Sequence, residues 1–303
     1  MGDIRSAAVI GAGLMGSQIA ELLARVATVR VTLVDASEEL AEQGVSGIAR
    51  RLEAFFVAKG KMTPEEHRQV LGRIAATADL ERAASEIDVA VEAVTENLAV
   101  KQALFARLDR AAQPHSVLAS NTSYLRIRDL ASATARPDRV VGLHFFNPVA
   151  LMKLVEVVRG PDTSEATVDV ACGLARRLGK EPVVCSDASF GFLANRAYFA
   201  LRLEAVQMVW ERVAAPEDID RALKLGHNLP VGPLELGDLG GSWGIYASSE
   251  GDRIRALGPV QGRLHPLVRL MVDAGYTGGP GRKGIYDYYR EVFSKTGEGV
   301  SRA

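Results

Sequence analysis

The sequence predicts an α/β domain over residues 1–187, built on a mostly parallel sheet, followed by an all-α domain over residues 188–303. In the first 185 residues, short apolar runs alternate with helical patterns, which is typical of βαβ units. After Cys185 the pattern is helical throughout, and glycine and proline mark the joints between helices. These two observations predict a two-domain protein.

Most of the predicted strands are continuous apolar runs, as expected of strands that are covered on both faces. They span residues 6–10, 29–34, 89–93, 116–119, 140–144, 154–158 and 182–185. A helical hairpin, residues 38–58 and 64–73, is inserted between the second and third of them. Thr63, Pro64 and Glu66 form a start signal for its second helix. The C-terminal helices are predicted at residues 192–214, 216–225 and 266–274.

Composition excludes several classes of protein. The 36 basic and 37 acidic residues give a net charge of −1, so the chain lacks the basic excess of a nucleic-acid-binding protein. Cys172 and Cys185 lie in apolar surroundings, which favours buried reduced thiols over a disulfide or a metal site. With no apolar run of membrane-spanning length and no signal-peptide pattern, we expect a soluble cytoplasmic protein without a metal.

A glycine-rich run follows the first predicted strand and opens a helix. Its first glycine permits a tight turn, its second lets a pyrophosphate approach the backbone, and its third lets helix and strand pack closely. The run reads Gly11-Ala12-Gly13-Leu14-Met15-Gly16. Alone this pattern is weak evidence, because glycine turns between strands and helices are common.

Asp35 strengthens the interpretation. It ends the second predicted strand, at the spacing where an acidic residue binds the adenosine ribose hydroxyls. Its charge would repel a 2′-phosphate, and no arginine follows closely. The sequence therefore predicts a Rossmann-like domain that binds NAD rather than NADP.

His144 and Glu156 are the candidate chemical pair. His144 closes an apolar strand, at the sheet edge where such folds bind ligands, and Glu156 interrupts the next apolar strand. A buried carboxylate is costly unless it is paired, and a short turn lets the two strands lie side by side. A histidine oriented by a carboxylate is a general base suited to removing a hydroxyl proton. The alternative is a histidine that is hydrogen-bonded in the core.

Other polar residues have ordinary explanations as well. The run Ser120-Asn121-Thr122-Ser123 follows a strand and could be a simple turn, and Asn195 could cap a helix. Asn147 is a further candidate. Among the remaining histidines, we expect solvated surface positions for three and leave His227 open; the three are His67, His115 and His265.

Together these motifs resemble the 3-hydroxyacyl-CoA dehydrogenase family over nearly the whole chain. The matching segments are GAGLMGSQIA, VEAVTENLAVK, ASNTS, GLHFFNP with MKLVEVV, LGKEPV, NR at 195–196, and KLG followed by PVGPLEL. The resemblance implies a helical C-terminal domain that forms a homodimer. It implies His144 as catalytic base with Glu156 as its partner, and Ser123 and Asn195 as ligands of the reacting oxygen. Around the nicotinamide it implies Glu96, Lys101, Asn121 and Asn147.

The resemblance also implies that acyl-CoA lies against the helical hairpin, with Arg51 and Lys59 as candidate contacts beside Ser123 and Tyr124. The chain departs from the family pattern at several places. Tyr124 stands where the family often has a serine, and Arg51 and Ala58 replace a serine and a lysine. The segment Ser189-Phe190-Gly191-Phe192 lacks the usual proline, and the tail reads Gly279-Pro280-Gly281-Arg282-Lys283-Gly284.

The leading hypothesis is reversible NAD-dependent oxidation of a short-chain (S)-3-hydroxyacyl-CoA to the 3-ketoacyl-CoA, within fatty acid metabolism. One alternative is a related dehydrogenase of a sugar acid or another hydroxy acid without CoA. Another is a non-catalytic NAD-binding protein. The non-catalytic alternative is disfavoured because all four residues assigned to the chemical site are present: His144, Glu156, Ser123 and Asn195.

Overall fold

The computed structural model describes residues 4–25 and 29–296. The chain forms two compact units, Met1–Phe192 and Leu193–Ala303. The boundary falls a few residues after the position expected from the change in sequence pattern. Each unit has its own hydrophobic core.

The first unit is built on one eight-stranded sheet with the order β3-β2-β1-β4-β5-β6-β7-β8. Neighbouring strands are parallel except β6 and β7, which pair antiparallel. The strands are β1 Ser6–Ile10, β2 Arg30–Val34, β3 Ile74–Thr77, β4 Val89–Glu92, β5 Val117–Ser120, β6 Val140–Phe145, β7 Leu154–Arg159 and β8 Glu181–Ser186. The order reverses between β1 and β4, which is the place where Rossmann-like sheets bind dinucleotides. All seven predicted strands are confirmed, and β3 was not predicted.

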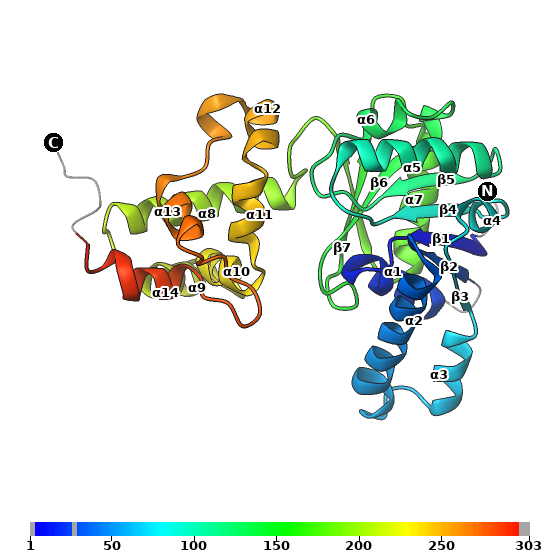
Figure 1. The fold of residues 1–303 in the computed structure, drawn as a ribbon, viewed down its shortest axis with the longest axis horizontal. Coiled ribbons are helices and arrows are strands. Elements are labelled where there is room, and N and C mark those ends of the chain that lie inside the picture. Colours follow the sequence, from blue (N-terminus) through cyan, green and yellow to red (C-terminus); the bar gives the residue numbers. More distant parts are fainter. Residues whose placement is uncertain (1–3, 26–28, 297–303) are drawn as a thin grey trace. The chain divides into compact units, whose positions relative to one another are not determined.

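Helices cover both faces of this sheet (Figure 1). Apolar residues of α1, α2, α3 and α7 pack on one face, and those of α4, α5 and α6 pack on the other. The helices are α1 Leu14–Arg25, α2 Glu38–Leu52, α3 Pro64–Leu71, α4 Leu80–Ala84, α5 Leu98–Ala111, α6 Ile127–Ala131 and α7 Glu165–Arg177, with a 3-10 turn at Pro137–Arg139.

The predicted helical hairpin projects from the sheet (Figure 1). Its first helix, α2, continues into a π-helical turn at Glu53–Val57. Its second, α3, begins with the predicted signal: the Thr63 hydroxyl accepts a hydrogen bond from the Glu66 amide, and the Glu66 carboxylate accepts one from the Thr63 amide. The N-terminal signal at Thr63 is therefore confirmed.

The second unit consists of helices joined by turns and loops, with no strand among its described residues. Its core contains Trp243, Leu234, Val206 and Met271, each almost fully buried. The helices are α8 Ala194–Trp210, α9 Pro216–His227, α10 Pro233–Leu239, α11 Ser242–Ser248, α12 Glu250–Gln261, α13 Pro266–Asp273 and α14 Ile285–Tyr288, which continues into a π-helical turn at Tyr289–Phe293. The all-α prediction for this part of the chain is confirmed.

Several smaller predictions can also be compared with the structure. Cys172 and Cys185 are buried free thiols, as predicted. Over residues 4–25 and 29–296, no helix has both the length and the apolarity needed to cross a bilayer. The prediction of solvated surface positions was wrong for His67, which is half-buried, and for His265. His265 precedes Pro266, caps α13 by accepting from the Leu267 amide, and also bonds Gln207.

Candidate active site

The glycine turn between β1 and α1 has the geometry that a dinucleotide needs. Gly11 has a φ of +102°, and a Cβ there would lie 2.7 Å from the Ala93 carbonyl oxygen. A Cβ on Gly16 would lie 1.8 Å from the Gly11 carbonyl oxygen, so neither position admits a side chain. At Gly13 a Cβ would meet no atom of the described residues within 4 Å. The backbone at Gly13 therefore faces open space beside the N-terminus of α1, which suits a pyrophosphate.

Two further residues of this run begin α1. Leu14 is 66% exposed, whereas Met15 is half-buried and packs against the core beneath the sheet. The turn thus presents Gly13 and Leu14 outward while Gly16 lies against the strand.

Asp35 lies at the end of β2, beside this turn. One carboxylate oxygen accepts from the Ala12 amide at 2.6 Å and the other from the Ala36 amide at 2.6 Å. These two bonds hold a negative charge next to the glycine turn. Ser37, two residues after Asp35, caps α2, and residues 36–39 include no cation that could bind a 2′-phosphate.

His144 and Glu156 meet as the sequence predicts. They are register partners on β6 and β7, and His144 Nδ1 lies 2.7 Å from Glu156 Oε2. His144 is 3% exposed and Glu156 is fully buried. An ionised carboxylate can only accept hydrogen bonds, so in the neutral imidazole the proton lies on Nδ1 and Nε2 presents a lone pair.

Two aromatic rings lie close to the His144 ring. The Phe146 and Phe192 rings lie 4.5 Å and 5.7 Å from the His144 ring, measured between centroids. Nearby, burial and the charge of Glu156 raise the pKa of the Cys185 thiol to about 12. The surroundings of the pair are thus apolar and disfavour any further anion.

The segment after β5 supplies polar groups at the same sheet edge. Asn121 accepts from the Phe145 amide at 2.9 Å, which ties the ends of β5 and β6 together. The Tyr124 ring stacks on Phe190, with 4.8 Å between centroids. Tyr124 and Phe190 thus link this segment to the altered stretch before the second unit.

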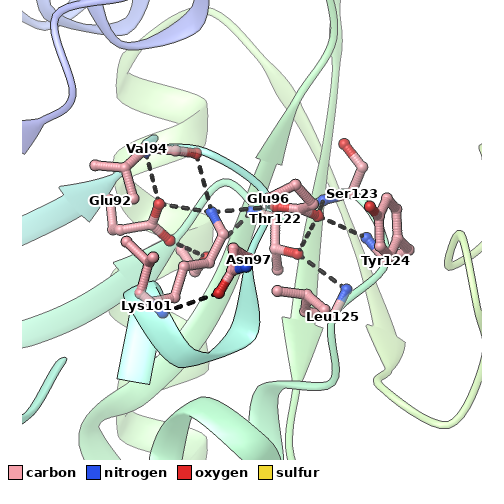
Figure 2. Close-up of polar contacts among 11 residues, drawn as sticks. Glu92, Val94, Glu96, Asn97, Lys101, Thr122, Ser123, Tyr124 and Leu125 are labelled. Atoms are coloured by element: carbon pink, nitrogen blue, oxygen red, sulfur yellow. Dashed lines mark hydrogen bonds and ion pairs between the residues drawn. The ribbon is translucent and has the colours of Figure 1, made fainter. Parts of the chain in front are cut away.

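Glu96 organises the turn that contains Ser123. One of its oxygens accepts from the Thr122 hydroxyl at 2.5 Å, the Ser123 amide at 2.8 Å and the Tyr124 amide at 3.3 Å (Figure 2). Its other oxygen pairs with Lys101 Nζ at 3.1 Å. The structure therefore brings together Glu96, Lys101 and Ser123, three predicted site residues.

Sequence reasoning missed two polar residues at this edge of the sheet. Glu92 ends β4, is fully buried and pairs with Lys101 at 2.6 Å. The available signal was a carboxylate in an apolar strand, the same signal that identified Glu156. Gln18 of α1 donates to the Asn147 side chain at 3.0 Å and accepts from the Val149 amide, which fastens the loop between β6 and β7 to α1.

A pocket of about 690 Å³ lies in the first unit, next to the helical hairpin. Four cations line it, together with apolar and amide side chains. The lining residues are Gln18, Glu21, Arg25, Arg51, Phe55, Phe56, Lys59, Lys61, Asn147, Pro148, Ala150 and Leu151. Arg51 is paired with Glu21 at 2.9 Å, and Lys59 Nζ lies 5.2 Å from the centre of the Phe55 ring. Both predicted CoA contacts therefore line one cavity.

Asn195 belongs to the second unit, at the start of α8. The N-cap position of α8 is Leu193, so Asn195 lies inside the first turn. Capping therefore does not explain this asparagine.

Known proteins share this architecture. The 3-hydroxyacyl-CoA dehydrogenase NAD binding domain matches residues 6–188, and the C-terminal domain of the same family matches residues 191–288. A probable 3-hydroxybutyryl-CoA dehydrogenase of Bacillus subtilis is 43% identical, over 94% of this chain and 98% of the relative.

Solved structures agree. The crystal structure of M. tuberculosis FadB2 superposes with a TM-score of 0.87 at 40% identity, over 94% of this chain and 99% of that one. The crystal structure of (S)-3-hydroxybutyryl-CoA dehydrogenase PaaH1 from Ralstonia eutropha also superposes with a TM-score of 0.87, at 35% identity and with the same coverage of both chains. The chain therefore belongs to the 3-hydroxyacyl-CoA dehydrogenase family, and its N-terminal unit is the NAD-binding domain of that family.

Proposed function

We propose that the protein oxidises short-chain (S)-3-hydroxyacyl-CoA to 3-ketoacyl-CoA with NAD, reversibly. The observation that carries the proposal is the buried His144–Glu156 pair, at the sheet edge that also holds the dinucleotide turn. The relatives named as 3-hydroxybutyryl-CoA dehydrogenases support the substrate class.

In this reaction His144 Nε2 accepts the proton of the substrate hydroxyl. The resulting imidazolium keeps its Nδ1–H bond to Glu156, whose charge stabilises the positive ring. Ser123 hydrogen-bonds the reacting oxygen, and the apolar rings around His144 keep water away. Asn195 is assigned to the same oxygen by the family resemblance.

The residues that would hold NAD fit that cofactor. Gly13 leaves room for a pyrophosphate, Asp35 ends β2 beside the glycine turn, which suits the adenosine ribose hydroxyls, and Asn147 lies on the loop fastened to α1. NAD held by these residues would supply the acceptor for the hydride that leaves C3 of the substrate. In the reverse direction His144 returns its proton to the oxygen.

We assign the CoA moiety to the pocket beside the helical hairpin. Its volume lies within the range of small-molecule sites. Lys59 and Lys61 offer ammonium groups to phosphates, whereas Arg51 is already paired with Glu21. The Tyr124 ring stacks on Phe190 next to Ser123, and we propose that its bulk, in place of a serine, favours short acyl chains.

The experiment compares kcat/KM for (S)-3-hydroxyacyl-CoAs of increasing chain length with kcat/KM for the matching free hydroxy acids. The reaction is monitored by the absorbance of the NADH that forms. We expect turnover of the CoA esters with a maximum at short chains. Lys59→Ala should raise the KM for the CoA ester, while Arg68→Ala should not, because Arg68 is on the same hairpin but pairs with Glu65. Turnover confined to the free acids, or none at all, would refute the proposal.

We further propose that the protein forms a homodimer through its helical C-terminal domain, predicted at residues 188–303. Large apolar side chains on its surface support this, including Leu225, Leu239, Ile245 and Val260, each at least 60% exposed. Light scattering at several concentrations tests it. A cytoplasmic location and a role in fatty acid metabolism remain predictions.

A further inference from the structure

The loop between β6 and β7, residues 146–153, forms one side of the pocket beside the helical hairpin. Between its pocket-lining residues stands Val149, which is 1% exposed and packs with the core of the first unit. A loop has few backbone bonds of its own, so this wall keeps its shape only if other elements hold it. The loop residues that line the pocket are Asn147, Pro148, Ala150 and Leu151.

Val149 is held at both of its backbone polar groups. Its amide donates to Gln18 Oε1 at 2.9 Å, and its carbonyl oxygen accepts from Lys180 Nζ. The same ammonium donates to the Met152 carbonyl oxygen at 2.7 Å, near the end of the loop. The Lys180 side chain therefore fastens the loop at two points.

Lys180 itself stands on a well-bonded support. It follows the last turn of α7, where Gly179 has a φ of +73° and the Lys180 amide donates to the Ala175 carbonyl oxygen at 2.9 Å. The next residue, Glu181, begins β8, and its amide donates to the Lys153 carbonyl oxygen at 2.9 Å. The Lys180 side chain is buried, so water competes little for the bonds that its ammonium makes.

The charge of Lys180 is costly in this position. Burial and the neighbouring charge of Arg25 lower the pKa of the Lys180 ammonium. Its bonds to the loop go to neutral carbonyl oxygens, which offset a buried charge less than a carboxylate would. A methionine would fill a similar volume without this cost, so the ammonium contributes through the bonds that it makes rather than through packing.

We propose that Lys180 is a positioning residue: it holds the loop 146–153 in place as a wall of the pocket to which we assign CoA. The proposal rests on the proposed function, since that function gives the pocket its ligand. Lys180 is not part of the pocket lining, so it acts through the loop rather than by contact with the ligand.

Loss of the ammonium would leave the Val149 and Met152 carbonyl oxygens without this donor. Val149 is buried, so its oxygen could reach water only if the loop moved. The loop would then spend part of its time away from the pocket. The apparent Kd of a ligand is its intrinsic Kd divided by the fraction of the protein that is competent to bind, so a fraction of about a third to a tenth raises Kd about three- to tenfold.

The first test needs neither turnover nor a ligand. In Lys180→Met we expect amide hydrogen exchange at residues 149–152 to rise about tenfold, the scale of one lost hydrogen bond. The Leu151 and Met152 amides both donate to the Pro148 carbonyl oxygen at 3.0 Å and therefore report on the loop directly. Lys180→Gln, whose shorter side chain withdraws the donor, should act in the same direction and serves if Lys180→Met does not fold. Unchanged exchange at these residues would overturn the proposal.

Arg136 provides a matched control. Its guanidinium also donates to backbone carbonyl oxygens of the first unit, those of Asp109 and Gln113. These bonds lie at the end of α5, which packs on the opposite face of the sheet from α1 and α7. Arg136→Met should lower the Tm without changing exchange at 149–152. If it changes exchange there as much as Lys180→Met does, the effect is general loosening and the proposal fails.

The second test measures the binding of free CoA and of NAD by calorimetry. In Lys180→Met the Kd for CoA should rise about three- to tenfold. The Kd for NAD should rise less, because Asn147 keeps its bond to Gln18. An unchanged Kd for CoA, or equal rises for CoA and NAD, would overturn the proposal.

Turnover gives an independent reading of the same variant. The KM for the CoA ester should rise while kcat stays within about twofold, which is the pattern of lost binding that is equal in the ground state and the transition state. A fall in kcat with an unchanged KM would contradict a role in shaping the pocket. If the unmodified protein binds no CoA, the proposed function fails, while the exchange test still decides whether Lys180 holds the loop.

Discussion

Replacing Glu156 with glutamine keeps the shape of the buried side chain and removes its charge. The pair is sealed from solvent, with 2.7 Å between Nδ1 and Oε2, so water cannot take over the lost interaction. A hydrogen bond to a charged partner contributes about 1.5–3 kcal/mol. If that contribution is made to the imidazolium that forms in the reaction, kcat should fall about 10- to 160-fold, since 1.36 kcal/mol is a factor of ten.

The assay is steady-state kcat with saturating substrate, together with the Kd for NAD and the Tm of each variant. His144→Gln should lose about 10²–10⁴-fold in kcat, the usual contribution of a general base. The double variant should lose less than the product of the two single losses, because Glu156 acts through His144. Glu165→Gln is the control: this exposed carboxylate pairs with Arg159 at the end of β7 and should leave kcat unchanged.

Three results would refute this reasoning. A near-normal kcat in His144→Gln would show that His144 is not the base. Losses that multiply in the double variant would show that Glu156 does not act through His144. A fall in Tm without a fall in kcat would show that the pair only stabilises the fold.

Three further predictions follow from the site. Asp35→Ala should narrow the preference for NAD over NADP in kcat/KM, because it removes the charge that repels a 2′-phosphate; equal use of both by the unmodified protein would contradict this. Tyr124→Ser should broaden activity toward longer acyl chains in a graded way, since one methylene in an apolar pocket is worth about 1–3 kcal/mol; a preference that already rises with chain length in the unmodified protein would contradict it. Burial raises the pKa of the Cys185 thiol to about 12, so it should resist alkylation at pH 8 until the protein is denatured. Because this pKa is raised above the unfolded value near 9, the associated stability is present below about pH 9 and is lost as pH rises toward 12, which urea titrations at several pH values would detect.

The sequence predicts the main architecture well because its signals are local. Continuous apolar runs identified seven strands, and the Thr63 signal located the start of α3. β3 was missed because its four residues, Ile74–Thr77, include two alanines and only two β-branched residues. It is a strand because it pairs with β2, which is a tertiary effect.

The contact between His144 and Glu156 could be predicted because each is a polar residue in an otherwise apolar strand. The contacts around Lys101 could not be predicted. Glu92 carries the same signal as Glu156, a carboxylate in an apolar strand, and its partner is nine residues away on a helix rather than on the next strand. A lysine at the start of an amphipathic helix is usually solvated, and only the packing of α5 beside β4 shows that Lys101 is buried. Burial of this kind depends on long-range packing, which local patterns do not report.

The antiparallel pairing of β6 and β7 explains why His144, Glu156 and the loop that carries Asn147 occur together. A parallel seventh strand would need a long crossover before it could lie beside β6. The antiparallel strand returns directly, so Glu156 in its interior is the register partner of His144 near the carboxyl end of β6. The connection, residues 146–153, then has to turn at the ligand edge of the sheet, where Asn147 meets Gln18 of α1. One reversal of strand direction thus brings His144 and Glu156 together and brings the Asn147 loop to the first turns of α1, where we propose that the cofactor binds.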